Sequence, residues 1–183
     1  MADNDAALVA RVIADDDRSA FELLVRRHQS PLRNFLRRLT GSDTGRADDL
    51  AQETLLKMYR SIHGYQGRAK FSSWLYQIAY NTFLNDQRRR HPETEFNESV
   101  HVAAVDDTAA AGDRSDIERA LRRLPARQQA VFDLHYKKGM THDEIAAALA
   151  LPLGTVKSDL TRGLVQLKGS LEDWQPNRGT GHD

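Results

Sequence analysis

The apolar side chains of residues 48–63 and 71–90 recur every three to four positions, and this spacing limits the fold more than any other feature. Such spacing is typical of one buried face of an α-helix. The first stripe contains Leu50, Ala51, Thr54, Leu55, Met58 and Ile62. The second contains Phe71, Trp74, Leu75, Ile78 and Ala79. Because no segment has the alternating pattern of a strand, the sequence predicts an all-α protein.

The outward faces of these two helices differ in charge. Asp49, Gln52 and Glu53 lie at i, i+3 and i+4 on the side opposite the first stripe, directly after Asp48. The second helix ends in the cationic run 88–90, and the segment 64–70 before it adds glycines, an aromatic and two cations. Each patch alone is most often solvated surface. Together, two surfaces of opposite sign suggest two different partners.

The remaining N-terminal helices complete a first bundle, which we expect over residues 1–91. A first helix has Leu8, Val9, Val12 and Ile13 facing inward, and a second has Phe21, Leu24 and Val25. Pro31 suits the first turn of a third helix, because its missing N–H is not needed there. Residues 92–114 carry few large apolar side chains, so they predict a flexible linker. A second helical domain is expected over 115–174 and a disordered tail over 175–183.

The charge of the chain is zero in total but unevenly distributed. Residues 21–90 carry 13 Lys/Arg against 6 Asp/Glu, and residues 91–116 carry 1 against 7. Residues 117–183 carry 10 against 8. A basic block, an acidic connector and a mildly basic block therefore cancel, and the neutral total does not argue against nucleic-acid binding.

The second domain has the pattern of a helix-turn-helix. Residues 141–144 form a capping box that opens one helix, residues 151–154 form a turn, and Thr155 is predicted to cap the last helix. That helix places Val156, Leu160, Leu164 and Leu167 toward the core. The side chains expected to face a major groove are Thr155, Lys157, Ser158, Thr161 and Arg162. The alternative for this pattern is a plain helical bundle.

The chain resembles region 2 of the extracytoplasmic-function (ECF) sigma factors in the segments 48–54 and 71–75 and at Asn81, Asp86 and Arg89. These proteins are the small promoter-specificity subunits of bacterial RNA polymerase. Residues 124–132 and 151–158 resemble region 4 of the same family. The resemblance implies two small helical domains joined by a flexible linker, the second a helix-turn-helix. It also implies that core polymerase binds Asp48, Asp49, Gln52 and Glu53, that region 2 binds the -10 element, and that region 4 reads the -35 element.

The residues expected at the -10 element are Tyr65, Arg68, Lys70, Asn81, Asp86, Arg88, Arg89 and Arg90. Tyr65 either stacks on an unpaired base or packs on Phe71. In region 4, Asp159 stands where the family commonly has a cation, and either accepts from a cytosine amino group or favours the helix N-terminus. Ala150 stands where the turn often has glycine, and a left-handed alanine there costs about 1 kcal/mol.

The sequence gives little support to other classes of function. No cysteine is present, and His135 and His142 flank a glycine turn, so neither a metal site nor another cofactor is expected. No phosphate loop or nucleophile–base pair indicates an enzyme. The alternative to a sigma factor is a helix-turn-helix repressor or activator with a helical regulatory domain. With no apolar run of membrane length and no signal-like N-terminus, a cytoplasmic stress-response protein is expected, and the resemblance implies an anti-sigma factor as a partner.

The acidic linker is also predicted to follow a defined path through the polymerase. Promoter elements about two duplex turns apart lie roughly 70 Å from each other. A relaxed coil of about 25 residues spans only ~28 Å. Residues 91–115 are therefore expected to be extended through the cationic RNA channel of the polymerase, where the resemblance places them. The alternative is that the acidic residues only keep a disordered spacer soluble.

Overall fold

The computed structural model describes residues 5–41, 43–91 and 116–172, which form helices joined by short turns and contain no strand. The first part of the chain contains α1 (Asp5–Asp15), α2 (Arg18–Leu39), α3 (Thr44–Ser61), the short 3₁₀ helix η1 (Ile62–Gly64) and α4 (Phe71–Arg90). The second part contains α5 (Asp116–Arg122), α6 (Ala126–Phe132), the π-helical turn η2 (Asp133–Lys137), α7 (His142–Leu149) and α8 (Leu153–Glu172). The prediction of two all-α parts is confirmed. The linker and tail predicted at 92–114 and 175–183 lie outside the described residues.

The helix α2 is continuous through Pro31, so the prediction of a separate third helix beginning there is wrong. A proline inside a helix removes one backbone hydrogen bond. Here the buried side chains His28 and Leu32 on either side of it continue one stripe, and this shared packing keeps the helix in one piece. Asp17 caps the N-terminus, where its carboxylate accepts from the backbone N–H groups of Ser19 and Ala20.

Of the stripe predicted for residues 48–63, the helix α3 buries Leu50, Ala51, Thr54 and Met58, with Ala47 in addition, against α2 and α4. Leu55 is half-buried, and Ile62 is buried in η1. At the N-terminus, α1 packs on α2, but Ile13 is exposed, contrary to the inward position predicted for it. A helix of 11 residues needs only one narrow stripe when a single face is covered. Leu8, Val9 and Val12 supply that stripe.

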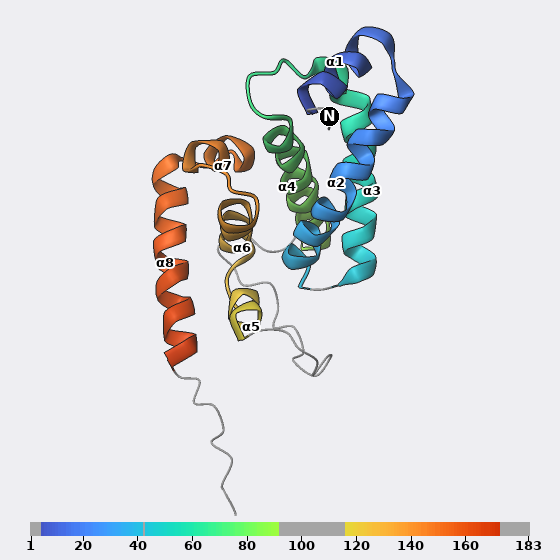
Figure 1. Ribbon diagram of the computed structural model, residues 1–183. Coiled ribbons are helices and arrows are strands. Elements are labelled where there is room, and N and C mark those ends of the chain that lie inside the picture. Colours follow the sequence, from blue (N-terminus) through green and yellow to red (C-terminus); the bar gives the residue numbers. More distant parts are fainter. Residues whose placement is uncertain (1–4, 42, 92–115, 173–183) are drawn as a thin grey trace, which may run out of the picture.

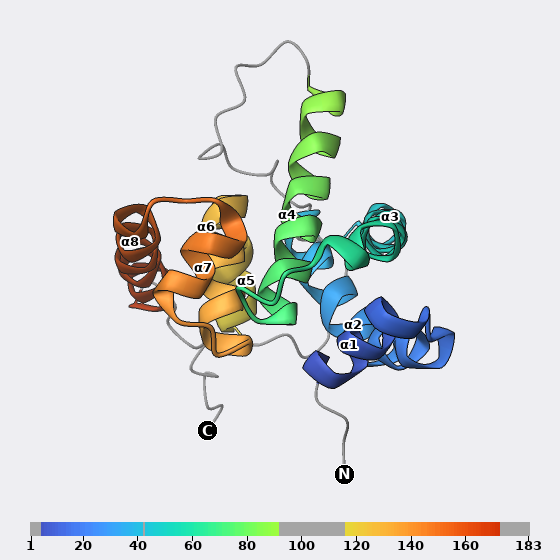
Figure 2. The same cartoon turned by 90° about the horizontal axis from the view of Figure 1, so that it is seen from above.

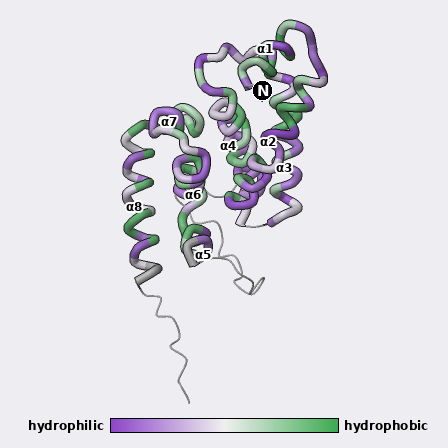
Figure 3. The backbone as a smooth tube through the Cα atoms, in the orientation of Figure 1, coloured by the Kyte–Doolittle hydropathy of each residue, from purple (hydrophilic) through white to green (hydrophobic). Residues whose placement is uncertain are grey.

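The helix α4 is buried on more than one face. Of the predicted stripe, Phe71, Leu75 and Ala79 are buried, whereas Trp74 and Ile78 are half-buried. The helix also buries Ser73, Tyr76, Tyr80, Phe83 and Leu84. The reason is that α7, from the second part of the chain, packs along α4, while α3 and α2 cover its other side (Figures 1 and 2). A helix covered from both sides no longer shows a single apolar stripe, and the hydropathy of α4 accordingly alternates around the helix (Figure 3).

In the second part, α7 and α8 form the predicted helix-turn-helix, with α8 outermost (Figure 1). The capping box of Thr141 and Glu144 is confirmed. Ala150 ends α7 in the predicted left-handed conformation, with φ of 54°. The helix α8, however, begins at Leu153 rather than behind a Thr155 cap, because the carbonyl of Pro152 accepts from the backbone N–H of Thr155.

The core side of α8 also differs from the prediction. Leu164 is exposed, whereas Gly163 is buried against the ring of Phe132. A Cβ atom added to Gly163 would lie 2.3 Å from Phe132 Cε2, so only glycine fits at this crossing. The position of Leu164 one residue later then turns its side chain to solvent. The core of α8 is therefore formed by Val156, Leu160, Gly163 and Leu167.

Candidate nucleic-acid interface

A stripe of polar side chains runs along the C-terminal half of α4 on the surface. Gln77, Asn81, Asn85 and Arg88 follow one another at spacings of four, four and three residues, so they share one helix face. Gln77 is half-buried and the other three are exposed. At 1.5 Å per residue, the stripe from Gln77 to Arg88 is about 16 Å long. It begins at the pocket wall, where Gln77 lies beside the loop residues, and ends at the arginines of α4, so it suits several nucleotides of an extended single strand better than a single base.

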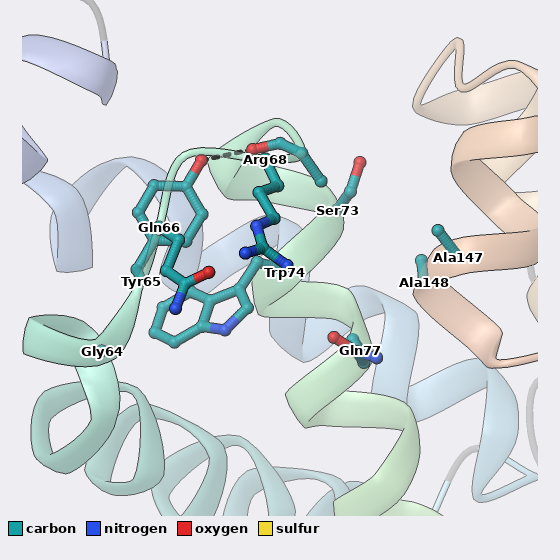
Figure 4. A pocket seen from close by; sticks show the side chains of 10 residues that line it. Gly64, Tyr65, Gln66, Arg68, Ser73, Trp74, Gln77, Ala147 and Ala148 are labelled. Atoms are coloured by element: carbon teal, nitrogen blue, oxygen red, sulfur yellow. Dashed lines mark hydrogen bonds between the residues drawn. The ribbon is translucent and has the colours of Figure 1, made fainter.

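The loop between η1 and α4 lines a pocket of about 240 Å³ together with the start of α4 (Figure 4). Its ring Tyr65 packs edge-on against Phe71, at 5.9 Å between centroids, and against Trp74 at 5.2 Å. The hydroxyl of Tyr65 donates to the carbonyl of Ala69. Of the two roles left open for Tyr65, the structure shows the packing role. Gln66 and Arg68 of this loop are exposed.

The arginines at the end of α4 are exposed as predicted, but Asp86 is not. Asp86 is buried and accepts from Arg46 at 2.7 Å and from Arg90 at 3.1 Å. Arg46 belongs to the first turn of α3, so this carboxylate joins α3 to α4 and holds Arg90 in place. The prediction that Asp86 contacts DNA is wrong for this conformation, because its oxygen atoms face two guanidinium groups.

The acidic-amide patch on α3 is only partly free. Asp49 and Gln52 are exposed. Asp48 instead pairs with Arg33 of α2 at 2.8 Å, and Glu53 pairs with Lys57 at 2.8 Å and with Arg89 of α4 at 3.7 Å. Asp48 and Glu53 therefore also tie α3 to its neighbours.

The outward face of α8 has Lys157, Thr161 and Arg162 exposed, with Thr155 and Ser158 at its edge. The hydroxyl of Thr161 donates to the carbonyl of Lys157 at 3.0 Å, which leaves its oxygen lone pairs for an outside donor. This arrangement of small polar and cationic side chains on the second helix agrees with the prediction. It is suited to the edges of bases in a major groove.

Asp159 does not share that face. It is fully buried and pairs with Arg127 of α6, at 2.7 Å and 3.3 Å from the two carboxylate oxygens. The prediction that it accepts from a base is therefore wrong for this structure. The sequence placed Asp159 one position before the apolar Leu160, and the partner that draws it inward lies 32 residues earlier in the chain.

Two residues that belong to the α4 stripe were missed from the sequence. Gln77 lies on the pocket wall and Asn85 lies between Asn81 and Arg88. Their spacing of four residues from Asn81 was the available signal. Among the described residues no group of three or more metal-binding side chains comes together, although the rings of His135 and His142 lie 5.1 Å apart.

Known proteins are similar to this chain in sequence and in fold. Residues 24–92 match the model of sigma-70 region 2, and residues 114–167 match that of sigma-70, region 4. The ECF RNA polymerase sigma-E factor of Haemophilus influenzae is 31% identical over 183 residues, covering 92% of this chain and 95% of that protein. The ECF RNA polymerase sigma factor SigM of Mycobacterium tuberculosis is 36% identical over 166 residues, covering 90% and 83%.

Solved structures agree. The sigma factor RpoE in complex with the anti-sigma factor NepR from Bartonella quintana aligns with a TM-score of 0.67 at 26% identity, covering 85% of this chain and 98% of that one. CnrH in complex with the cytosolic domain of CnrY aligns with a TM-score of 0.68 over 94% and 100%, and at 22% identity it supports the fold alone.

The fold and its exposed surfaces define a two-part helical protein whose second part carries a helix-turn-helix. The chain belongs to the ECF sigma factors of the sigma-70 family. Its function is that of an RNA polymerase sigma factor, which directs core enzyme to promoters and initiates transcription. No helix among residues 5–41, 43–91 and 116–172 combines the length and apolar character that crossing a bilayer requires.

Proposed function

We propose that each of three surfaces of this chain binds a different partner during promoter-specific initiation. The Asp49/Gln52 face of α3 binds core polymerase. The loop 64–70 and the polar stripe of α4 bind the -10 element, and the outward face of α8 binds the -35 element. The observation that carries the proposal is the stripe Gln77, Asn81, Asn85 and Arg88, because it makes one continuous polar track from the loop to the arginines. Since the protein acts by binding, we assign it no catalysis of its own.

The core-binding assignment rests on the exposure of Asp49 and Gln52. Asp49 and Gln52 are exposed on the middle of α3, so a change there does not remove packing. Glu53 is less suitable for a test, because its pairs with Lys57 and Arg89 join α3 to α4. Asp49→Arg together with Gln52→Arg should weaken binding to core enzyme by at least about tenfold, since like charges across an interface oppose association.

The control for that variant is Glu22→Arg, which reverses an exposed acid on α2 whose side chain is 66% accessible and raises the net charge by two units, against three in the double variant. It should bind core enzyme as the wild type does. Equal affinities of the wild type and the Asp49→Arg/Gln52→Arg variant would remove the core-binding assignment. Circular dichroism checks that each variant is folded.

The -10 assignment rests on charge and geometry together. A single strand needs cations along its backbone and a surface for unstacked bases. The run 88–90 supplies the cations, and the loop with Gln66 and Arg68 supplies polar groups at the other end of the stripe. Arg88→Ala with Arg89→Ala should reduce open-complex formation by the holoenzyme, measured with permanganate footprinting, while core binding is retained.

The control removes two cations elsewhere. Arg26 and Arg60 are exposed on α2 and α3 and lie outside the stripe, so Arg26→Ala with Arg60→Ala changes the net charge equally. Open complexes should form normally with this control. A loss of the same size in both variants would mean that only the total charge matters, and the stripe would not be the DNA surface.

The partners follow from the same surfaces. Core RNA polymerase and promoter DNA are the binding partners, and the site of action is the bacterial cytoplasm. An anti-sigma factor is a further partner that we propose, because the solved relative RpoE was captured in complex with the anti-sigma factor NepR. Co-purification from cells in which this chain carries an affinity tag, compared with an untagged strain, tests for it.

A further inference from the structure

A pocket of about 230 Å³, separate from the one in Figure 4, lies between the end of α2 and the second part of the chain. Cationic side chains from both parts line it. The first part supplies Arg37 and Arg38 of α2, and the second supplies Arg122 of α5 and Lys137 of η2. One acid, Glu118 of α5, lines the pocket as well. Positive charge therefore dominates a hollow that two distant segments of the chain build together.

Two of these cations are not committed to an acidic partner. Asp48 Oδ1 lies 3.9 Å from Nη2 of Arg37, but only 2.8 Å from Nε of Arg33. The Nε–H of Arg37 is buried and donates to no acceptor in the part of the chain that the structure describes. Arg122 is half-buried and forms no ion pair with a described residue. Arg37 and Arg122 are therefore available to an anion from outside.

The other two cations are neutralised only in part. Arg38 contacts Asp133 at 2.5 Å, whereas Glu118 lies 3.9 Å from Nζ of Lys137, beyond the reach of a hydrogen bond. The neighbouring Lys138 is affected by the same charges. Burial is the main cause of its lowered pKa; Asp133 raises that pKa, and the charges of Arg38 and Lys137 lower it. Repulsion between cations of the two parts therefore reaches across this contact.

Like charges on the two sides of an interface oppose its formation. Here the guanidinium of Arg37 in the first part shares a pocket with Arg122 and Lys137 of the second part. An anion placed between them would replace this repulsion by attraction on both sides. The arrangement thus has the charge pattern of an anion site.

The size and the lining of the pocket indicate the kind of anion. One water molecule needs about 10–15 Å³ of such a cavity, so 230 Å³ has room for an anion of many atoms. Planar guanidinium groups bind the oxygens of a phosphate in pairs. Among the described residues that line the pocket none is aromatic and only Leu121 is a large apolar side chain, so a nucleobase has no stacking surface. Phosphate groups are therefore what the lining can recognise.

We propose that this pocket binds a linear oligophosphate of two or three phosphate groups, with Arg37 and Arg122 as its principal ligands from the two parts of the chain. Lys137 adds a charge, and the side chains of Asn34 and Thr44 add neutral donors. An inorganic oligophosphate and the phosphate tail of a nucleotide share this chemistry. The site uses none of the residues assigned to core polymerase or to promoter DNA, so it can be tested independently of those assignments.

The first experiment titrates the full-length protein with pyrophosphate by isothermal calorimetry, at fixed ionic strength and without divalent cations. One equivalent should bind, at least tenfold more tightly than orthophosphate or sulfate. Equal affinities for the three anions would mean that the pocket only attracts charge, and would overturn the proposal. Adenosine diphosphate separates the two sources of the ligand. Affinity tenfold above that of pyrophosphate supports a nucleotide, and affinity equal to it or lower supports an inorganic oligophosphate.

Substitutions in the pocket should act with opposite signs. Arg37→Gln and Arg122→Gln each remove one charge and should weaken pyrophosphate binding at least tenfold, because each loses charge-assisted hydrogen bonds. Arg37→Lys keeps the charge without the planar fork and should lose less affinity. Glu118→Gln removes the acid from the lining and should tighten binding about threefold. Weaker binding in Glu118→Gln would contradict the proposal.

The matched control is Arg26→Gln with Arg60→Gln, which removes two exposed cations of α2 and α3 that lie outside the pocket. It has the same net charge as the Arg37→Gln/Arg122→Gln variant. Pyrophosphate should bind the control as it binds the wild type, and should raise the Tm of both while leaving the Tm of the pocket variant almost unchanged. An equal loss of affinity in the control would show that only net charge matters. Circular dichroism checks that each variant is folded.

The remaining alternative is that these cations contact the backbone of DNA. In that case pyrophosphate fails to bind the wild type, while Arg37→Gln/Arg122→Gln weakens promoter binding by the holoenzyme, and the oligophosphate proposal is wrong. Arg88→Ala/Arg89→Ala should leave the affinity for pyrophosphate unchanged. A tenfold loss in that variant would move the anion to the proposed -10 surface and would likewise overturn the pocket assignment.

Discussion

The crossing of α8 over Phe132 gives the sharpest test of the second part of the fold. Changing Gly163 to alanine adds a Cβ atom 2.3 Å from Phe132 Cε2 and 2.9 Å from Cζ. Carbon atoms prefer separations of about 3.5–4.0 Å, so one of the two helices must shift or the ring must turn. Phe132 is only 5% exposed, which leaves its ring little room.

The size of the effect follows from two opposing contributions. Overpacking a core costs about 1–3 kcal/mol, and an overlap of this depth belongs at the upper end. Alanine in a helix is favoured over glycine by about 1 kcal/mol. We therefore expect Gly163→Ala to lower the free energy of unfolding by about 2 kcal/mol, which lowers Tm by about 4–8 °C in a chain of this size.

Gly169 on the same helix is the matched control, because nothing lies within 4 Å of an added Cβ there. Gly169→Ala should raise the free energy of unfolding by up to about 1 kcal/mol. The two substitutions should differ by about 3 kcal/mol in urea unfolding followed by circular dichroism. Adding Phe132→Leu should recover part of the loss in a double-mutant cycle. If both alanine variants were equally stabilised, the packing of α8 on α6 would be incorrect.

Three further predictions concern single residues. Arg127→Ala leaves the fully buried Asp159 without its guanidinium partner and should lower the free energy of unfolding, measured in urea, by about 3–5 kcal/mol. Replacing Arg127 by Met and Asp159 by Leu together should lower it much less. Equal losses in the two variants would show that the pair is not coupled. The hydroxyl of Ser19 first, then the N–H of Ala20 and Arg11, hold the pKa of Asp17 far below its ordinary value of 3.8. Because the folded-state pKa of Asp17 is depressed, its contribution to stability is present above about pH 4 and is lost as the pH falls further. Asp17→Asn should therefore flatten the dependence of the unfolding free energy on pH between about pH 4 and 2. Parallel curves for the variant and the wild type would contradict this. Ala150→Gly should raise the free energy of unfolding by about 0.5–1 kcal/mol, because glycine removes the left-handed strain but also loosens the unfolded chain; a loss of stability would argue against the left-handed turn.

Local sequence patterns determined the helices and the family. The periodic stripes of 48–63 and 71–90, the capping box at Thr141 and the turn before α8 depend on residues a few positions apart, and all of them are found in the structure. The exposed faces of α3 and α8 were predictable for the same reason, since a side chain opposite an apolar stripe points outward. Pro31 misled the prediction because packing on both sides of it overrides its local preference.

The tertiary structure alone decided which charged side chains are free. Asp86 and Asp159 carry the same local signal as an exposed acid, yet Arg46 and Arg127, 40 and 32 residues away in the chain, draw them into buried pairs. The same holds for Tyr76, whose buried ring lies 5.0 Å from the ring of Phe35 on α2 and 5.8 Å from the ammonium of Lys138 in the second part of the chain. Periodicity reports one buried face of a helix, but it cannot name a partner that arrives from a distant segment. The contact of Glu144 with Lys70 is of that kind, because each residue reads as solvated surface until the fold brings the two together.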